Sequence, residues 1–175
     1  MAILKIARMG HPVLLQPAAP VEDPSDPEVA RLVADMIETM HDAGGVGLAA
    51  PQVHVGLRLF VYRVPPGREG EGAAPVGDQV LMNPELAGEG AATELGWEGC
   101  LSIPGLRGAV PRHAEIIYRG LDRAGRPVAG RASGFAARVM QHEYDHLEGI
   151  LYPMRMTDFR LFAFEEEMAR FARPE

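Results

Sequence analysis

The sequence predicts an α+β protein whose strands form a mostly antiparallel sheet, and three observations support this. A helical pattern near the N-terminus is followed by several strand patterns and then by a second helical pattern. Glycine, with 20 residues, and proline, with 15, are frequent, which favours long turns over a helical bundle. The length of 175 residues suits one domain, 1–175, with room for a buried core.

The first helix is predicted just after a proline-rich stretch. Ser25 and Asp26 can cap its N-terminus, Pro27 suits the first helical position, and Glu28 favours the first turn. Apolar residues then recur on one helical face: Val29, Leu32, Val33, Met36, Ile37 and Met40. Two successive glycines at 44–45 end the pattern.

Strand patterns follow the first helix. Segments 57–62 and 80–82 are predicted to be strands, and the proline- and glycine-rich segment between them, about 65–78, is expected to be a flexible loop. Residues 112–121 alternate well enough for a half-buried strand, and the turn at 122–125 leads into another short strand at 127–129.

Two further helices complete the predicted order of elements. Ser133 can cap a helix over about 135–148, which ends at Gly149. A C-terminal helix over about 157–172 would place four apolar residues on one face: Leu161, Phe164, Met168 and Phe171.

Composition excludes several classes of protein. The formal net charge of −7 argues against a nucleic-acid or anionic-membrane binder. A lone cysteine, Cys100, cannot form an intrachain disulfide. Because no uninterrupted apolar run approaches about 18 residues and the N-terminal run is broken by charges, we expect a cytoplasmic protein without a transmembrane helix.

The strongest chemical signal is a His-Glu-x-x-His pattern in segment 141–149. His142 and His146 are four residues apart, so on a helix both imidazoles can bind one metal ion. Glu143 directly follows the first of them, the position of a general base beside such a metal.

A catalytic metal site usually has three protein ligands, so a third one is needed. Glu165 and Glu166 have the spacing of a zinc peptidase ligand, about 19–20 residues beyond the second histidine. Cys100 is the other candidate, since a thiolate is a common metal ligand. Spacing alone does not decide between Cys100 and a glutamate as the third ligand. A non-catalytic peptide-binding protein is a further alternative to an enzyme.

Three segments taken together resemble the bacterial type of the peptide deformylase family. They are Gly45-Val46-Gly47-Leu48-Ala49-Ala50-Pro51-Gln52, then Glu98-Gly99-Cys100-Leu101-Ser102, then the segment 141–146 that begins Gln-His-Glu. The resemblance extends over roughly residues 5–155. It implies a hydrolase that removes the N-formyl group from N-formylmethionyl peptides of nascent proteins and releases formate.

The resemblance also implies the residues of the metal site. Cys100, His142 and His146 would hold one metal ion, typically Fe²⁺, with Zn²⁺, Ni²⁺ or Co²⁺ as substitutes. Glu143 would move the proton of the attacking water. The side-chain amide of Gln52 and the backbone N–H of Leu101 would stabilise the developing oxyanion.

The substrate is expected to bind along backbone and apolar side chains of this site. The residues implied are Gly45, Val46, Gly47, Gly99, Phe135, Arg138 and Val139. Arg138 departs from familiar bacterial members, where an aliphatic residue often stands. The fold expected is antiparallel sheets packed around the central helix that carries the motif, in a monomer. The acidic run Glu165–Glu167 leads us to expect at most weak contact with the ribosome.

Overall fold

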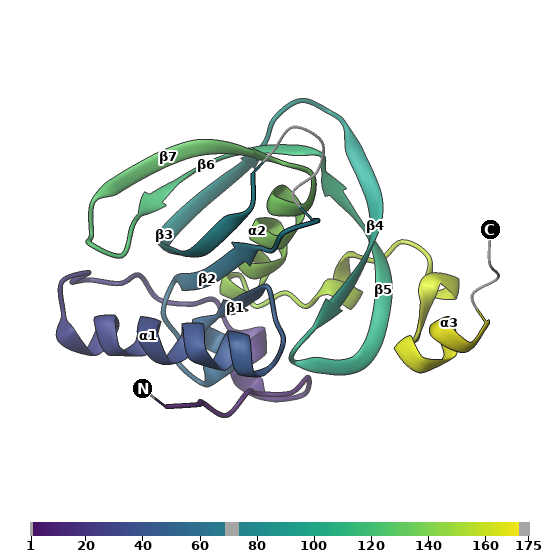
Figure 1. Ribbon diagram of the computed structural model, residues 1–175, viewed down its shortest axis with the longest axis horizontal. Coiled ribbons are helices and arrows are strands. Elements are labelled where there is room, and N and C mark those ends of the chain that lie inside the picture. Colours follow the sequence, from purple (N-terminus) through teal and green to yellow (C-terminus); the bar gives the residue numbers. More distant parts are fainter. Residues whose placement is uncertain (1, 69–73, 172–175) are drawn as a thin grey trace.

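The computed structural model describes residues 2–68 and 74–171 of the chain. Two antiparallel sheets surround one central helix, α2, while α1 lies along the outside of the larger sheet (Figure 1). The predicted α+β class, with mostly antiparallel sheets around the motif-bearing helix, is therefore confirmed. Among the described residues, no helix is both long enough and apolar enough to span a bilayer.

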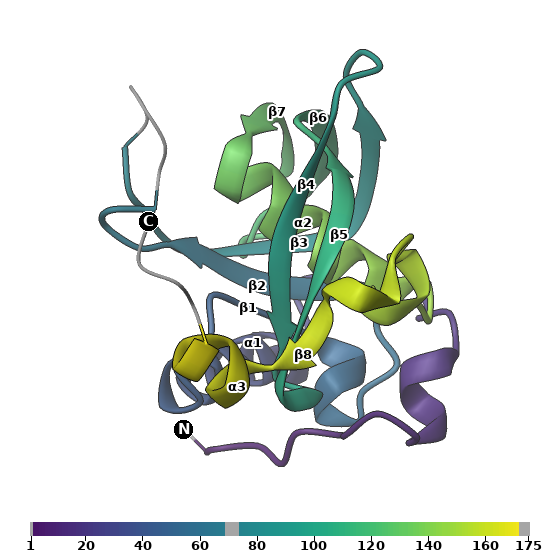
Figure 2. The same cartoon turned by 90° about the vertical axis from the view of Figure 1, so that its right-hand side faces the viewer.

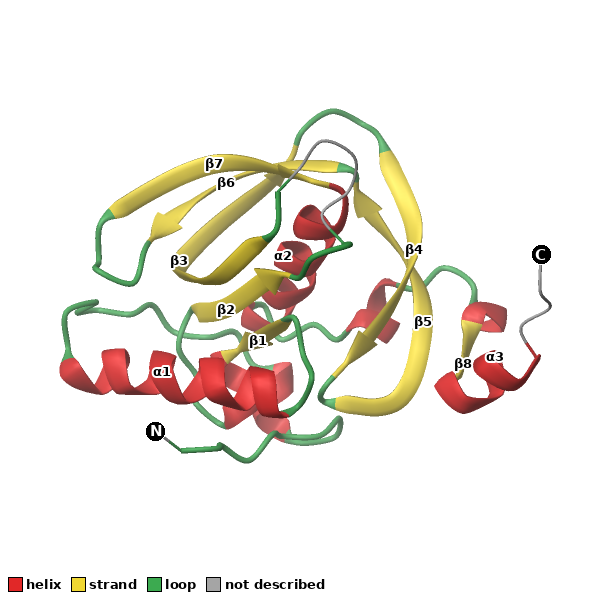
Figure 3. Cartoon of the chain, viewed as in Figure 1, coloured by secondary structure: helices red, strands yellow, loops and turns green. Residues whose placement is uncertain are grey.

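Most of the strands follow one another between α1 and α2, as Figure 3 shows. The α-helices are α1 (Pro27–Asp42), α2 (Gly134–Leu147) and α3 (Glu165–Phe171). The 3₁₀ helices are η1 (Pro12–Leu15), η2 (Ala50–Val53), η3 (Tyr152–Arg155) and η4 (Phe159–Leu161). The strands are β1 (Gly47–Ala49), β2 (Leu59–Val64), β3 (Val76–Gly88), β4 (Thr93–Cys100), β5 (Ile103–His113), β6 (Glu115–Leu121), β7 (Pro127–Ser133) and β8 (Phe162–Phe164).

The larger sheet has five strands in the order β1-β2-β3-β6-β7. Within the part of the chain that the structure describes, strand β1 pairs with β2 alone, through Gly47 opposite Tyr62 and Ala49 opposite Phe60, so it forms one edge of this sheet. An edge strand leaves a row of backbone groups able to pair with another extended chain.

Helix α1 begins where the sequence predicts, because the Asp26 side chain accepts a hydrogen bond from the backbone N–H of Glu28. Its apolar face packs on β1 and β2 and includes Val33, Met36 and Met40, each at most 1% exposed. Burial of this face fixes the segment that leads from α1 into β1.

Helix α2 fills the space between the larger sheet and the β4–β5 hairpin (Figure 1). One side of it, which includes Ala137 and Met140, packs against Phe60 and Leu81 of the larger sheet. The side that carries the motif histidines is therefore left to face the hairpin. Ser133 precedes the helix as predicted, although its side chain makes no capping hydrogen bond.

The smaller sheet consists of β4, β5 and β8, in that order. Figure 2 shows β8 lying beside β5. A separate apolar cluster under this sheet includes Leu14, Val110 and Tyr152, all at most 1% exposed. This cluster packs the N-terminal segment and η3 against the β4–β5 hairpin, whose first strand ends at Cys100.

The predicted C-terminal helix over 157–172 is wrong for its first half. Residues 159–161 form η4, residues 162–164 form β8, and only Glu165–Phe171 are α-helical. Phe162 and Phe164 lie opposite Gly108 and Leu106 of β5, so pairing with the edge of a distant strand overrides the local helical spacing.

The predicted flexible loop over 65–78 is also too long. Strand β3 already begins at Val76, which pairs with Val64 of β2. Residues 69–73 of that prediction lie outside the described residues. The predicted strand 112–121 is divided at Ala114, where the chain leaves β5 for β6 of the other sheet.

Candidate active site

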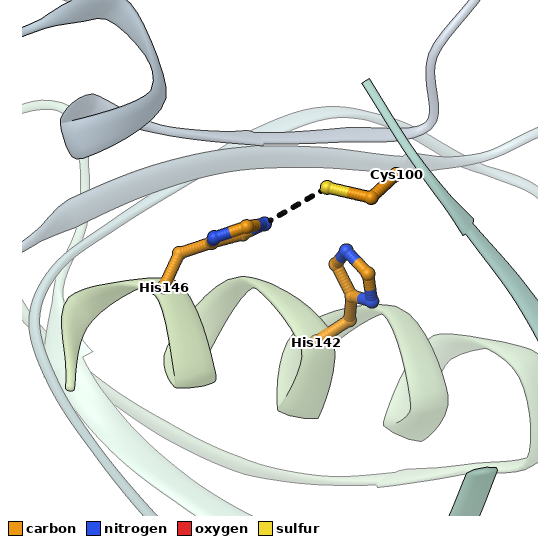
Figure 4. Close-up of side chains that lie close together, drawn as sticks. All are labelled: Cys100, His142 and His146. Atoms are coloured by element: carbon orange, nitrogen blue, oxygen red, sulfur yellow. Dashed lines mark hydrogen bonds between the residues drawn. The ribbon is translucent and has the colours of Figure 1, made fainter. Parts of the chain in front are cut away.

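Three potential metal ligands, a cysteine and two histidines from a distant part of the sequence, lie close together where β4 reaches α2 (Figure 4). Cys100 is the last residue of β4, and His142 and His146 lie one turn apart on α2. Their donor atoms all lie within 4.8 Å of one another. Within residues 2–68 and 74–171, this is the only group of three such side chains so close together.

The spacing of these donors fits a metal ion. The Sγ atom of Cys100 lies 3.3 Å from Nε2 of His146. Tetrahedral bonds to one ion, about 2.3 Å from sulfur and about 2.0–2.1 Å from nitrogen, place such atoms roughly 3.6 Å apart. One thiolate and two imidazoles form a donor set typical of transition metals such as zinc, iron, nickel and cobalt.

Glu98 fixes the orientation of one of these histidines. Its Oε2 atom accepts a hydrogen bond from Nδ1 of His142 at 2.8 Å, which leaves the other ring nitrogen as the atom able to bind a metal. Burial alone would raise the pKa of Glu98, but hydrogen bonds from His142 and Arg112 and their positive charges lower it to about 2. Glu98 is therefore a carboxylate at neutral pH.

A buried arginine connects this carboxylate to a second one on α2. Arg112 donates two hydrogen bonds to Glu98, at 2.9 and 3.0 Å, and a third to Asp145. On its other side, Asp145 accepts a hydrogen bond of 2.7 Å from Arg155. These charged groups join β4, β5, α2 and η3 at one point directly behind the metal ligands.

The sulfur of Cys100 is surrounded by donors. The backbone N–H of Ser102 lies 3.4 Å from Sγ, and Nε2 of Gln52 lies 3.5 Å from it. Burial would raise the pKa of the thiol, but positive charge on His146 and His142 and their hydrogen bonds lower it well below its usual value. A thiolate, the form that binds metals, is thus favoured.

The amide of Gln52 is held in one orientation. Its Oε1 atom accepts a hydrogen bond from the N–H of Ala49 at 2.8 Å, and its Nε2 donates to Ser102 Oγ at 3.1 Å. The side chain is 1% exposed. The amide N–H groups therefore point towards Ser102 and Cys100.

Glu143 is buried beside the ligands and lies against backbone. A Cβ atom on Gly47 would come within 2.2 Å of its Oε1 atom, so only glycine at position 47 leaves room for this carboxylate. The Oε2 atom has no hydrogen-bond partner among the described residues. Burial raises the pKa of Glu143 to about 7, although His142 and His146 favour its charged form. Such a group can both accept and return a proton near neutral pH.

A cavity of about 700 Å³ opens directly onto this group. Gln52, Cys100, Leu101, His142 and Glu143 line its inner end. All seven predicted substrate residues also line it: Gly45, Val46, Gly47, Gly99, Phe135, Arg138 and Val139. The geometry thus brings together the predicted metal ligands, the predicted base and the predicted substrate contacts, whose roles remain predictions.

The alternative third ligands do not join the cluster. Glu165 lies at the outer rim of the cavity, where its Oε1 atom accepts a hydrogen bond from Arg107 at 2.7 Å. Neither Glu165 nor Glu166 belongs to the group of potential ligands around His142. The geometry therefore gives no support to a peptidase with a glutamate as third ligand.

Sequence reasoning assigned no role to the residues behind the ligands. Glu98 lies within the motif segment. It follows Gly96 by two residues on β4, so these two residues share a face of the strand. Arg112 and Arg155 carry no local signal, because the sequence does not show which strands and turns meet α2. Asp145, which could be either a surface or a supporting carboxylate, is buried.

Comparison with known proteins agrees with this site. The family model described as polypeptide deformylase matches residues 3–161. The chain is 47% identical over 164 residues to peptide deformylase 2 of Ralstonia nicotianae, covering 94% of this chain and 93% of that protein. It is 48% identical over 161 residues to peptide deformylase 2 of Bordetella bronchiseptica, covering 92% of each.

Solved structures show the same likeness in three dimensions. Peptide deformylase from Thermotoga maritima matches with a TM-score of 0.79 and 37% identity, covering 90% of this chain and 100% of that one. A class I type b peptide deformylase from Acinetobacter baumannii, solved with Met-Ala-Ser bound, matches with a TM-score of 0.82 and 36% identity, covering 89% and 99%. On sequence, fold and site together, this chain belongs to the polypeptide deformylase family.

Proposed function

We propose that this protein hydrolyses the N-formyl group of N-formylmethionyl peptides, releasing formate and a free amino terminus. The observation that carries the proposal is that three potential metal ligands lie close together, and that two of them, Cys100 and His142, line one cavity with Glu143 and Gln52. A protein that only bound peptides would need neither a buried carboxylate of raised pKa nor an amide aimed at the metal ligands.

Cys100, His142 and His146 would hold the metal, which we propose to be Fe²⁺, with Zn²⁺, Ni²⁺ or Co²⁺ as substitutes. The resemblance to the family supports iron, and the thiolate and imidazole donors also suit the other ions. When bound, such an ion supplies a Lewis acid and makes hydroxide available near neutral pH.

Two side chains would then move the proton and stabilise the developing charge. Glu143 accepts a proton from the attacking water and returns it to the departing amine as the bond between formyl carbon and nitrogen breaks. The Nε2 amide of Gln52, with the backbone N–H of Leu101, donates hydrogen bonds to the oxygen that becomes negative. The hydrogen bond that Gln52 accepts from Ala49 keeps its amide in place during these steps.

The substrate would bind as an extended chain beside β1. This strand is an edge of the larger sheet, and its neighbouring residues Gly45 and Val46 line the cavity. A peptide can therefore add to the free edge through backbone hydrogen bonds, a common mode of peptide recognition. Val46, Phe135 and Val139 provide an apolar wall for the methionine side chain.

The direct test is formate release from a formyl-Met-Ala dipeptide by protein prepared and assayed without oxygen. We expect metal-dependent turnover, and we expect Glu143→Gln to keep its metal but lose about 10²–10⁴-fold in kcat. Absence of formate release by the metal-loaded wild-type protein would contradict the proposal. Equal activity of Glu143→Gln would show that another group is the base.

We further propose a monomer that acts in the cytoplasm and binds ribosomes weakly. The first turn of α3 is acidic, which does not favour contact with RNA. Light scattering should give the mass of one chain. Sedimentation with ribosomes should show little bound protein, whereas tight, salt-sensitive binding through residues 157–175 would contradict this part of the proposal.

A further inference from the structure

Arg138 lies on α2 one turn before His142, so its side chain leaves the helix on the same face as that ligand. It lines the cavity, which is why a contact with substrate is the obvious role. Its side chain is nevertheless only 15% exposed. The question is therefore what its guanidinium group binds.

The guanidinium is already occupied by the β4–β5 hairpin. Its Nη2 atom donates to the carbonyl of Glu94 at 2.7 Å. Its Nη1 atom lies within hydrogen-bond distance of the carbonyls of Val110, at 2.8 Å, and Gly96, at 3.3 Å, and of Oε1 of Glu98, at 2.9 Å. These four acceptors come from both strands of the hairpin, so the polar end of Arg138 is engaged there and its aliphatic stem is the part left to line the cavity.

Gly96 leaves room for the guanidinium of Arg138. A Cβ atom at position 96 would lie 2.8 Å from both Cζ and Nη2 of Arg138, closer than such atoms approach. The absence of a side chain at Gly96 therefore lets the guanidinium reach the carbonyls behind it. The observed position of the Arg138 guanidinium thus requires glycine at 96.

The same contacts connect the two elements that carry the metal ligands. Cys100 lies on β4 two residues after Glu98, while His142 lies on α2. Glu98 binds His142 through Oε2 and accepts from Arg138 through Oε1. Loss of Arg138 would remove one of the connections between the strand that carries the thiolate and the helix that carries the imidazoles, and one charge partner of a buried carboxylate.

We propose that Arg138 is a positioning residue and that it does not select the substrate. It holds strand β4, which carries Cys100, in a fixed position relative to helix α2, which carries His142, so that both can bind the metal. Arg112 also binds Glu98, so the loss of Arg138 weakens the connection between β4 and α2 without abolishing it. The kinetic part of the following test rests on the proposed deformylase activity, whereas its metal part does not.

The experiment compares Arg138→Met, Arg138→Lys and Gly96→Ala with wild type, each as Co²⁺-loaded holoenzyme. Arg119→Met, which removes an exposed arginine of β6 that neither lines the cavity nor belongs to the ligand group, is the matched control. The measurements are the visible absorption spectrum of the bound cobalt, its rate of loss to a chelator, and kcat/KM for formyl-Met-Ala, formyl-norleucyl-Ala and formyl-Leu-Ala.

We expect Arg138→Met to shift the cobalt bands and to bind the metal more weakly, so that it loses cobalt faster, by about tenfold, the lower end of the loss in affinity when a partner of a metal ligand is removed. Arg138→Lys should restore part of the loss, and Gly96→Ala should shift the bands in the same direction because it displaces the guanidinium. The kcat/KM values should fall by a common factor, so that the ratios between substrates stay within about twofold. Arg119→Met should match wild type.

A wild-type cobalt spectrum and metal-loss rate in Arg138→Met, whether or not the substrate ratios change, would overturn the proposal. A changed ratio combined with unaltered metal binding would instead make Arg138 a specificity residue. Should Arg138→Met not fold, Arg138→Lys and Gly96→Ala decide on the same criteria. Should the wild-type protein release no formate, the proposed function fails while the cobalt measurements still test the role of Arg138.

Discussion

Ion pairs in this protein occur in two very different settings. Behind the metal ligands, Arg112 and Glu98 are 6% and 4% exposed and are bound to further charged groups on each side. On the larger sheet, Arg119 and Glu85 form an equally direct pair, yet they are 70% and 64% exposed. Both pairs join neighbouring elements, but only the first is removed from water.

The difference shows where charge matters in this structure. Removing charges from water is costly, so the buried network contributes little net stability, but deleting one member leaves the others without a partner. The surface pair is solvated with or without its partner and contributes little. We infer that the buried network persists because it orients His142 and places Cys100 beside it.

The largest effect on stability is expected for Arg112→Met. This change leaves Glu98 and Asp145 buried with fewer partners, which should lower the free energy of unfolding by about 3–5 kcal/mol. Urea unfolding of the metal-loaded protein, with Arg119→Met as the surface control, measures the contrast. Equal unfolding midpoints for the two variants would contradict the distinction between the two settings.

Gln52→Ala should have its effect on chemistry. Loss of one donor to a developing oxyanion costs about 10²–10³-fold in kcat in other enzymes. Because Gln52 is not one of the three ligand residues, the metal content should stay close to that of wild type. A variant that lost its metal along with its activity would show that the amide supports the site and does not act on the substrate.

A small effect is expected for Glu165→Ala. Its carboxylate is 59% exposed and binds Arg107 at the rim, and exposed pairs contribute about 0.2–1 kcal/mol. We therefore expect full metal content and less than about a fivefold change in kcat/KM. Loss of the metal from this variant would support Glu165 as the third metal ligand and contradict the assignment of Cys100.

The sequence was sufficient for the parts of the site that carry residue-specific motifs. The His-Glu-x-x-His spacing predicted a helix with both imidazoles on one face, and α2 has them there. The segments that include Gln52 and Cys100 predicted the other groups around the cavity. Helix α1 was predictable because its cap and apolar spacing are local properties.

What the sequence could not supply depends on contacts between distant segments. The spacing of Leu161, Phe164 and Met168 suits a helix, yet β8 forms because the edge of β5 accepts it. Arg112 carried no signal in the sequence, because its role depends on how the hairpin lies against α2. Arg138 was predicted to contact substrate from the family resemblance, and it lines the cavity, but nothing in the sequence indicated that its donors bind backbone carbonyls and Glu98.

The central claim is that Cys100 completes a metal site with His142 and His146. The most direct measurement is metal content and formate release of Cys100→Ala beside wild type, both prepared without oxygen, with folding checked by circular dichroism. The account predicts about one metal ion per wild-type chain, and for the folded variant neither bound metal nor activity. A folded Cys100→Ala protein that kept its metal and still released formate would contradict it.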